Sequence, residues 1–158
     1  PGTGGTVLRN RAFCRDEPLM LIHADNLSLL DAKALMARFD TRGEDIDMTL
    51  MTFRTDAPES CGIVVVDAGG GVREFHEKPK VPRGNLANAA VYILSPKVVS
   101  FMAGLGKDEV DFSTEVLPNF VGRIITFHND VYHLDLGKEA GPALPPVGAP
   151  LPAARAPG

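Results

Sequence analysis

The chain has 158 residues, of which 44% are hydrophobic and 23% charged, and its formal net charge is −4. These values are ordinary for one globular domain and argue against a mostly disordered or membrane-embedded chain. The acidic balance argues against a general nucleic-acid surface, and neither a membrane span nor a signal peptide is indicated. We therefore expect no nucleic-acid or membrane partner and a cytoplasmic location.

The cysteines and histidines show no pattern of a metal or redox site. Cys14 and Cys61 lie far apart without metal-ligand spacing, so core packing or free thiols are favoured over a disulfide framework. The histidines have neither a nucleophile partner nor zinc spacing, and we expect ordinary core or rim positions for them. They are His23, His76, His128 and His133.

The two ends of the chain differ from its middle. Residues 141–158 are Pro, Ala and Gly almost without charge, which predicts a disordered tail or a sequence artefact. The start passes from a Gly-rich turn into a helical pattern with no strand before it, as if the chain began in mid-domain. We expect a partial domain over residues 1–140, followed by the tail.

A β-α-β pattern follows this start. Residues 18–25, PLMLIHAD, run apolar up to an acid and predict a buried strand. Residues 28–43 predict a helix with a capping box of Ser28 and Asp31, and residues 46–53 predict the next strand. Together they predict a right-handed parallel unit. The core side of its helix is expected to carry Leu35, Met36 and Phe39.

The remaining elements complete an α/β sheet. Residues 61–78 predict a hairpin about a Gly-rich turn, and residues 86–94 predict a strand. Residues 95–106 predict a helix that begins at a proline and ends before a glycine. Residues 122–137 predict two short strands. The order indicates a mostly parallel sheet with antiparallel additions.

Two predicted strands end on an acid, Asp25 and Asp135. Ligands of open α/β sheets bind beyond the carboxyl ends of the strands. Mg²⁺ takes one or two carboxylates and shares its other positions with water and phosphate oxygens. The two acids could therefore form one magnesium site, whereas each acid alone could equally shape a turn.

Glu77 and Lys78 form a further polar pair, at the end of the predicted hairpin. As neighbours on a strand they should face opposite sides, unless a bulge or the approach to Pro79 redirects one of them. Such an acid could accept hydrogen bonds from sugar hydroxyls, and such a lysine could hold a phosphate. A solvated, ion-paired strand end is the alternative.

Two other motifs are weaker. The GTGGT stretch at residues 2–6 could offer backbone N–H groups to an anion or a nucleobase, although a plain tight turn is favoured. Asp45 and Asp47 form a D-x-D, as in metal-dependent glycosyltransferases. They lie at the start of their strand, however, which is the wrong edge for the ligand crevice.

Six segments, in order along the chain, together resemble the sugar-1-phosphate nucleotidyltransferases. They read LIHADN, SCGIVVVD, VREFHEKP, GNLANAAVYIL, DFSTEVLP and YHLDLG, and the resemblance covers about residues 2 to 140. It is nearest to the mannose-1-phosphate guanylyltransferase-like branch. It implies a three-layer α/β/α Rossmann-like sheet and an enzyme that joins GTP to mannose 1-phosphate, releasing pyrophosphate. A homo-oligomer is compatible with it.

The resemblance also implies a role for each matching residue. Asp25 and Asp135 would hold the Mg²⁺ cofactor, and Lys78 would position the sugar phosphate, which makes these three the expected catalytic residues. Glu77 would bind the sugar hydroxyls. The other expected substrate contacts are Gly62 and Asn88 at the sugar, with Gly2 and Thr3 at the nucleobase.

The chain departs from the family pattern at two points. Residues 88–90 read Asn-Ala-Ala, where the family usually has Asn-Ala-Gly or Asn-Thr-Gly. The family's G-G-x-G-T-R-L loop, which holds the triphosphate, does not occur in residues 1–158. We therefore expect an N-terminally truncated domain with impaired turnover. A non-catalytic regulatory subunit that binds sugar nucleotides on the same fold is the alternative.

Overall fold

The computed structural model describes residues 2–14, 16–130 and 132–135, and the predicted tail lies outside this part of the chain. The helices are α1 (Gly2–Arg9), α2 (Ala32–Asp40) and α3 (Pro96–Gly104), with short helical turns at Arg11–Phe13, Pro58–Ser60, Phe112–Val116 and Leu117–Phe120. The strands are β1 (Leu19–Ile22), β2 (Asn26–Leu29), β3 (Met48–Arg54), β4 (Gly62–Val66), β5 (Val72–Glu77), β6 (Leu86–Leu94), β7 (Ile124–His128) and β8 (Tyr132–Asp135). No described helix is both long and apolar enough to span a membrane.

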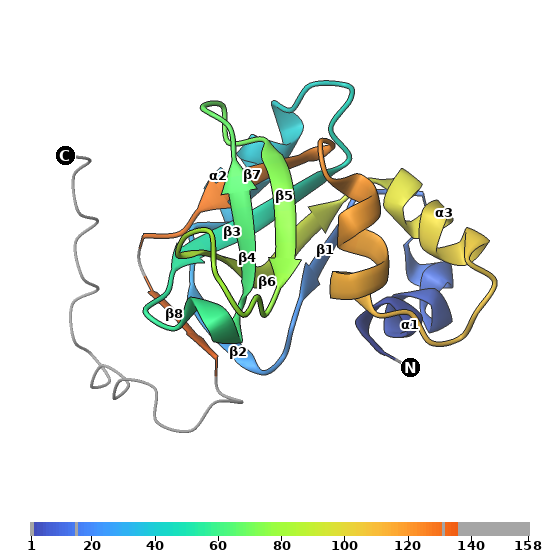
Figure 1. The fold of residues 1–158 in the computed structure, drawn as a ribbon. Coiled ribbons are helices and arrows are strands. Elements are labelled where there is room, and N and C mark those ends of the chain that lie inside the picture. Colours follow the sequence, from blue (N-terminus) through green and yellow to red (C-terminus); the bar gives the residue numbers. More distant parts are fainter. Residues whose placement is uncertain (1, 15, 131, 136–158) are drawn as a thin grey trace.

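The main sheet has the order β5-β4-β6-β3-β7, with β1 also paired to β6 (Figure 1). The predicted α/β class is confirmed, but the prediction of a mostly parallel sheet is wrong. Only β3 and β7 pair in parallel among the described strands of this sheet. The reason is β6, which lies antiparallel between β1 and β3, so the two strands of the β-α-β unit run in the same direction without touching.

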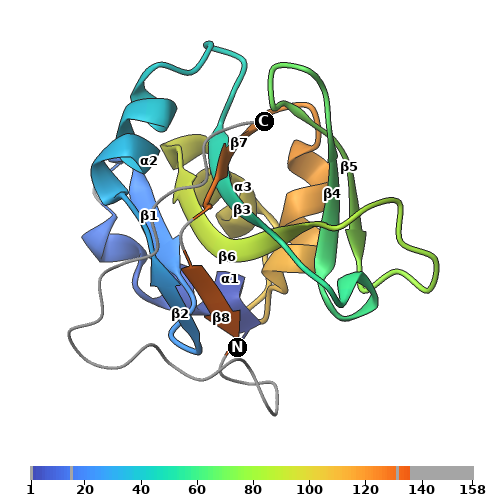
Figure 2. The same ribbon diagram turned by 90° about the vertical axis from the view of Figure 1, so that its left-hand side faces the viewer.

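Helices cover the sheet from two sides, which gives three layers (Figures 1 and 2). On one side α1 and α3 contribute Val7, Val98 and Met102 to the larger apolar core, and α2 contributes Leu35 and Phe39 to the smaller one. Strand β6 serves both cores because its side chains alternate between the two faces. Its Tyr92 and Leu94 belong to the larger core, whereas Ala89, Val91 and Ile93 belong to the smaller one.

Three local predictions in the β-α-β unit are wrong. Strand β1 is not buried throughout, because β6 is its one partner among the strands that the structure describes, and Met20 and Ile22 are 37% and 50% exposed. Helix α2 begins later than predicted, since Ser28 belongs to β2 and the cap is Asp31, whose carboxylate accepts from the Ala34 N–H at 3.0 Å. Met36, predicted in the core, is 54% exposed, whereas the burial of Leu35 and Phe39 is confirmed.

A second, two-stranded sheet joins β2 to β8 (Figure 2). The two strands predicted in residues 122–137 are confirmed, but they belong to different sheets, with β7 beside β3 and β8 antiparallel to β2. In this small sheet Asn26 lies opposite Asp135. The segment after β1 and the end of β8 are therefore neighbours, although more than a hundred positions separate them in sequence.

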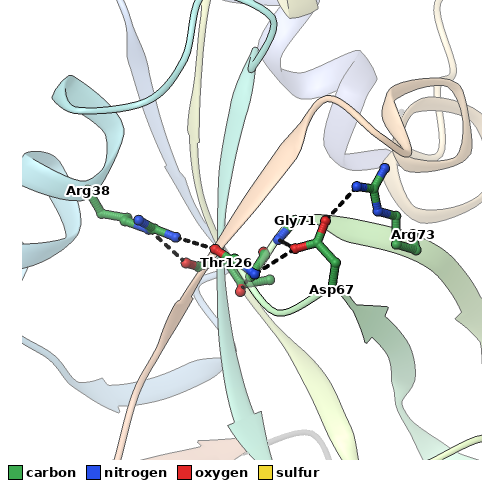
Figure 3. A network of polar contacts seen from close by, with 7 residues as sticks. Arg38, Asp67, Gly71, Arg73 and Thr126 are labelled. Carbon is green, nitrogen blue, oxygen red and sulfur yellow. Dashed lines mark hydrogen bonds and ion pairs between the residues drawn. The ribbon is translucent and has the colours of Figure 1, made fainter.

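The predicted β4–β5 hairpin is confirmed, and its Gly-rich turn is fastened to the rest of the fold (Figure 3). Oδ1 of Asp67 accepts from the N–H groups of Gly69 and Gly71 at 2.9 Å each, and Oδ2 pairs with Arg73 at 2.6 Å. From α2, Arg38 donates to the carbonyls of Gly69 and Thr126. The far end of the hairpin is thereby fixed to both α2 and β7.

Candidate active site

A cavity of about 250 Å³ opens beside the bent part of β6. Five of the predicted site residues line it, namely Asp25, Gly62, Glu77, Lys78 and Asn88. They come from the turn after β1, from the open end of the β4–β5 hairpin and from β6. The topology therefore brings into one cavity residues that are separated by up to 63 positions in sequence.

Asp25 and Asp135 are neighbours through the small sheet. Directly opposed residues of antiparallel strands have Cα atoms about 4.5–5.5 Å apart, and Asp135 lies opposite Asn26, the residue after Asp25. The Asp25 side chain is exposed and lines the cavity. The structure thus brings the two positions together, while metal binding stays a prediction. Among the residues it describes, no three His, Cys, Asp or Glu side chains form a metal cluster.

The charges of the cavity suit a divalent cation. Its lining carries two carboxylates, Asp25 and Glu77, against one ammonium group, that of Lys78. A phosphate dianion placed there would meet net negative charge unless a cation offset it. Carboxylate oxygens are the ligands that Mg²⁺ prefers, so the donor set fits that ion.

Glu77 and Lys78 both line the cavity, although neighbours on a regular strand would face opposite sides. Lys78 follows the last residue of β5, and its φ is +44°, in the left-handed region. Its N–H still donates to the carbonyl of Cys61 at 3.1 Å, which continues the β4–β5 pairing. The left-handed backbone at Lys78 turns its side chain toward the same cavity as that of Glu77. This is the change of direction before Pro79 that the sequence analysis allowed for.

Gly62 is buried and lies opposite Glu77 in the β4–β5 ladder. A Cβ atom at this position would lie 2.8 Å from Cζ of Phe75 and 3.0 Å from Oε2 of Glu77. Both distances are shorter than ordinary van der Waals contact, so any side chain would displace the carboxylate or the ring. Glycine at position 62 keeps the Glu77 carboxylate in the cavity.

Asn88 lies where β6 departs from regular pairing. Leu50 of β3 pairs with Tyr92, but Thr52 pairs with Asn88, so β6 bulges between these two points. The Asn88 side chain spans the bulge, because its Oδ1 accepts from the Ala90 N–H at 2.9 Å and its Nδ2 donates to the Tyr92 hydroxyl at 2.7 Å. This network fixes the orientation of the amide at the cavity wall.

Ala90 has a φ of +54°, a conformation that favours glycine. The family resemblance led us to expect glycine here, and the backbone of Ala90 has the conformation that glycine adopts without strain. Three described non-glycine residues have positive φ, and two of them, Lys78 and Ala90, line the cavity. Strained residues of this kind cluster at functional sites.

Tyr92 forms the buried floor of the cavity and is 1% exposed. Burial raises the pKa of its hydroxyl, and the nearby carboxylates of Glu77 and Asp111 act in the same direction against the hydrogen bond from Asn88. The hydroxyl therefore stays protonated at neutral pH. Its ring packs on Phe112 at 4.8 Å between centroids, which ties the floor to the larger core.

Gly2 and Thr3, the predicted nucleobase contacts, do not line this cavity. They form the first turn of α1, where Gly2 has a φ of +65°. The Oγ1 of Thr3 lies 3.2 Å from Nε2 of His23, and His23 does line the cavity. The turn is therefore attached to the site through one side chain.

Sequence reasoning assigned no role to several residues of the lining. His23 was expected in an ordinary core or rim position, and Cys61 was expected as a core residue or free thiol. Both line the cavity. Ser113 lies within the DFSTEVLP segment, which was part of the family match although none of its residues was singled out. Chain order alone carries no signal that these residues approach the hairpin.

The D-x-D motif lies outside the site, as predicted. Asp47 is buried just before β3, where its carboxylate accepts from the Ser95 hydroxyl at 3.1 Å and forms ion pairs with Arg123 and Lys97. Asp45 is exposed. The motif anchors the start of the strand, at the edge of the sheet remote from the cavity.

Comparisons with known proteins show the family to which this chain belongs. The sequence profile of the nucleotidyl transferase family matches residues 1–139. A glucose-1-phosphate adenylyltransferase of Lachnospira eligens is 28% identical over 144 residues, which cover 86% of this chain and 34% of that protein. Mannose-1-phosphate guanylyltransferase 1 of Arabidopsis thaliana is 31% identical over 102 residues, or 62% of this chain and 28% of that protein. The chain thus spans about a third of the length of these relatives.

Solved structures show the same fold. HddC of Yersinia pseudotuberculosis superposes with a TM-score of 0.71 at 24% identity, covering 87% of this chain and 58% of HddC. A putative glucose-1-phosphate thymidylyltransferase of Bacillus anthracis gives a TM-score of 0.73 at 19% identity, covering 85% of this chain and 54% of that chain. With the match over residues 1–139, these findings establish that the chain belongs to the nucleotidyl transferase family.

Proposed function

We propose that the protein joins a nucleoside triphosphate to a sugar 1-phosphate, giving a nucleotide sugar and pyrophosphate. The observation that carries this proposal is the gathering of Asp25, Gly62, Glu77, Lys78 and Asn88 around one cavity. Lys78 offers a positive charge to a phosphate, and Asp25 offers a carboxylate to a metal ion. Glu77 and Asn88 offer a carboxylate and an amide to the hydroxyl groups of a sugar. This is the chemistry that a sugar 1-phosphate needs for recognition.

In the proposed reaction, an oxygen of the sugar phosphate attacks the α-phosphorus in line with the departing pyrophosphate. Lys78 holds the attacking phosphate, while Glu77 and Asn88 orient the sugar. Positioning of two reactants can contribute about 7–11 kcal/mol to catalysis, so no side-chain nucleophile is needed. The attacking phosphate is already deprotonated at neutral pH, and no general base is needed either.

Asp25 and Asp135 are the residues that would hold Mg²⁺, given their adjacency through the β2–β8 pairing. When bound, the ion would neutralise phosphate charge that the carboxylates of the cavity otherwise repel. Lys78 and the two aspartates thus have distinct roles, since Lys78 binds the sugar phosphate and Asp25 and Asp135 would bind the metal ion.

GTP and mannose 1-phosphate are our preferred substrates. Two mannose-1-phosphate guanylyltransferases, at 31% and 34% identity, support this choice. The glucose-1-phosphate adenylyltransferases match a longer part of the chain at lower identity, so ATP with glucose 1-phosphate is the pair to compare.

The test is release of pyrophosphate by the full-length protein with Mg²⁺ and each substrate pair. We expect turnover with GTP and mannose 1-phosphate, its loss in Asp25→Asn, and a large rise of the KM for mannose 1-phosphate in Lys78→Met. Lys80→Met is the matched control, because Lys80 is an exposed lysine two residues away that does not line the cavity. Binding of both substrates without turnover would instead identify a regulatory subunit.

A further inference from the structure

His23 connects three segments of the site. Its main-chain N–H donates to the carbonyl of Ala90 at 3.2 Å, which ties it to the β6 bulge. Its carbonyl accepts from the N–H of Asn26 at 3.3 Å, which closes the turn that presents Asp25. Its ring Nε2 lies 3.2 Å from Oγ1 of Thr3 in the first turn of α1.

The ring of His23 is held on more than one side. It is half-buried and meets the ring of Tyr92 edge-on, with 6.4 Å between the centroids. Tyr92 itself is fixed by the hydrogen bond from Asn88. The imidazole therefore has a supported orientation, with its Nε2 directed to Thr3 rather than free to turn.

The turn of α1 that carries Thr3 is held in place by Val110. The N–H of Gly4 donates to the carbonyl of Val110 at 3.0 Å, and a Cβ on Gly2 would lie 2.6 Å from that same oxygen. The first turn of α1 is thus pressed against the segment before Phe112. The contact between Thr3 and His23 is the side-chain link from this anchored turn to the end of β1.

We propose that His23 is a positioning residue that sets the Gly2–Thr3 turn relative to the turn that carries Asp25. This inference rests on the proposed function, in which Asp25 serves the phosphates, and on the expectation from the family resemblance that the Gly2–Thr3 turn contacts the nucleobase. The hydroxyl of Thr3 can donate to an unprotonated Nε2 or accept from a protonated one, so the link is available to either tautomer. Its role is to fix the separation of base and phosphate subsites.

The link predicts an asymmetric effect on the two substrates. His23→Leu keeps an apolar side chain against Tyr92 but removes the hydrogen bond to Thr3. We expect the KM for GTP to rise about tenfold, the magnitude of one lost hydrogen bond, while the KM for mannose 1-phosphate changes less than twofold. His23→Gln, whose amide nitrogen can reach toward Thr3, should restore most of the affinity for GTP.

The experiment is steady-state kinetics on the full-length protein for His23→Leu, His23→Gln, Thr3→Val and the double variant His23→Leu with Thr3→Val. The double variant should be no worse than either single variant, because both remove the same contact. Equal rises of both KM values would mean general damage to the fold and would overturn the proposal. An unchanged KM for GTP in His23→Leu would overturn it as well.

These results separate the inference from the function on which it rests. If the wild-type protein releases no pyrophosphate and binds neither substrate in calorimetry, the proposed function fails and this inference fails with it. If the wild type is active and His23→Leu behaves like the wild type, only the role of His23 is refuted.

Discussion

Gly62 lies opposite Glu77 in the β4–β5 ladder, and the space above its Cα is already filled by the side chains of Glu77 and Phe75. The Oε2 of Glu77 would lie 3.0 Å from a Cβ at position 62, well inside normal contact. A residue without a side chain is thus a geometric condition for the carboxylate to stay where it lines the cavity.

Gly62→Ala should therefore weaken binding of the sugar 1-phosphate. We expect the Kd to rise by about tenfold or more, because the new methyl group displaces the Glu77 carboxylate, and the unfolding free energy to fall by about 1–3 kcal/mol from overpacking. Calorimetry with mannose 1-phosphate and urea denaturation measure the two effects. Gly43→Ala is the control, since a Cβ there meets nothing within 4 Å. An unchanged Kd in Gly62→Ala would show that Glu77 does not contact the sugar.

Ala90→Gly should make the protein more stable. A left-handed backbone costs an L-residue about 1–2 kcal/mol, and glycine removes this cost. Against this gain, the unfolded chain has more conformational freedom with glycine, which lowers stability by about 0.4–1 kcal/mol. We therefore expect a net stabilisation of about 0.5–1 kcal/mol.

The matched control for this change is Ala87→Gly, at a buried position of the same strand without positive φ. It should destabilise the protein by about 1–2 kcal/mol, because glycine in a regular strand carries an entropic penalty and the buried methyl group of Ala87 is lost as well. Urea denaturation of the two variants should give effects of opposite sign. Destabilisation by Ala90→Gly would argue that the methyl group has a packing role that outweighs the strain.

Substitution of Asp47 and substitution of Asp45 should differ in their effect on the stability of the protein, and neither should affect catalysis. Asp47→Ala removes a buried carboxylate that is hydrogen-bonded to Ser95 and paired with Arg123, and we expect a loss of about 2 kcal/mol or more in unfolding free energy. Arg123 is half-exposed, so its freed charge can be solvated, which keeps the cost below that of a fully buried pair. Asp45→Ala should change stability by less than about 0.5 kcal/mol.

The substrate affinities of these two variants decide between the readings of the D-x-D motif. Neither substitution should change the Kd for nucleotide or sugar phosphate once the protein is folded. Loss of nucleotide binding in a folded Asp45→Ala variant would revive the glycosyltransferase interpretation, which the position of Asp47 before β3 otherwise opposes.

Much of the element order could be predicted from local patterns, but the pairing of strands could not. Proline at the start of α3 and glycine after its end marked that helix correctly, because capping is a local property. The insertion of β6 between β1 and β3 joins residues 32 to 75 positions apart, and periodicity carries no information about such partners. The exposure of Met20 and Ile22 could not be predicted for the same reason, because it depends on β1 lying at the edge of the described sheet, beside β6.

The site was predictable where residue chemistry and chain order sufficed. Asp25, Glu77 and Lys78 were recognisable as polar residues at strand ends, and the resemblance gave them roles. His23 was not recognisable, because its importance depends on a contact with Thr3 that only the folded chain creates. The left-handed backbone at Lys78 was equally hidden, although the approach to Pro79 hinted at a change of direction.

The carboxylate of Asp67 should make stability depend on pH. The N–H of Gly71 is the main cause that lowers the pKa of Asp67, with Gly69 and Arg73 adding to it against partial desolvation. The folded pKa lies below the unfolded value of about 3.9, so the stabilisation is fully present above that value and is lost as the pH falls through the folded pKa. Glu74 and Glu115 act in the same direction, because hydrogen bonds from His76 and Lys107 lower their pKa values.

Asp67→Asn isolates this contribution, because asparagine keeps an acceptor oxygen for the Gly69 and Gly71 N–H groups but loses the charge that faces Arg73 (Figure 3). We expect the variant to be less stable than the wild type at pH 6, and the difference to shrink below about pH 4 as Asp67 protonates. Urea denaturation at pH 6, 5, 4 and 3 measures it, with Asp56→Asn, at an exposed aspartate after β3, as the control. A difference that stayed constant from pH 6 to pH 3 would mean that Asp67 acts through turn geometry alone, and that its charge contributes nothing to holding the hairpin.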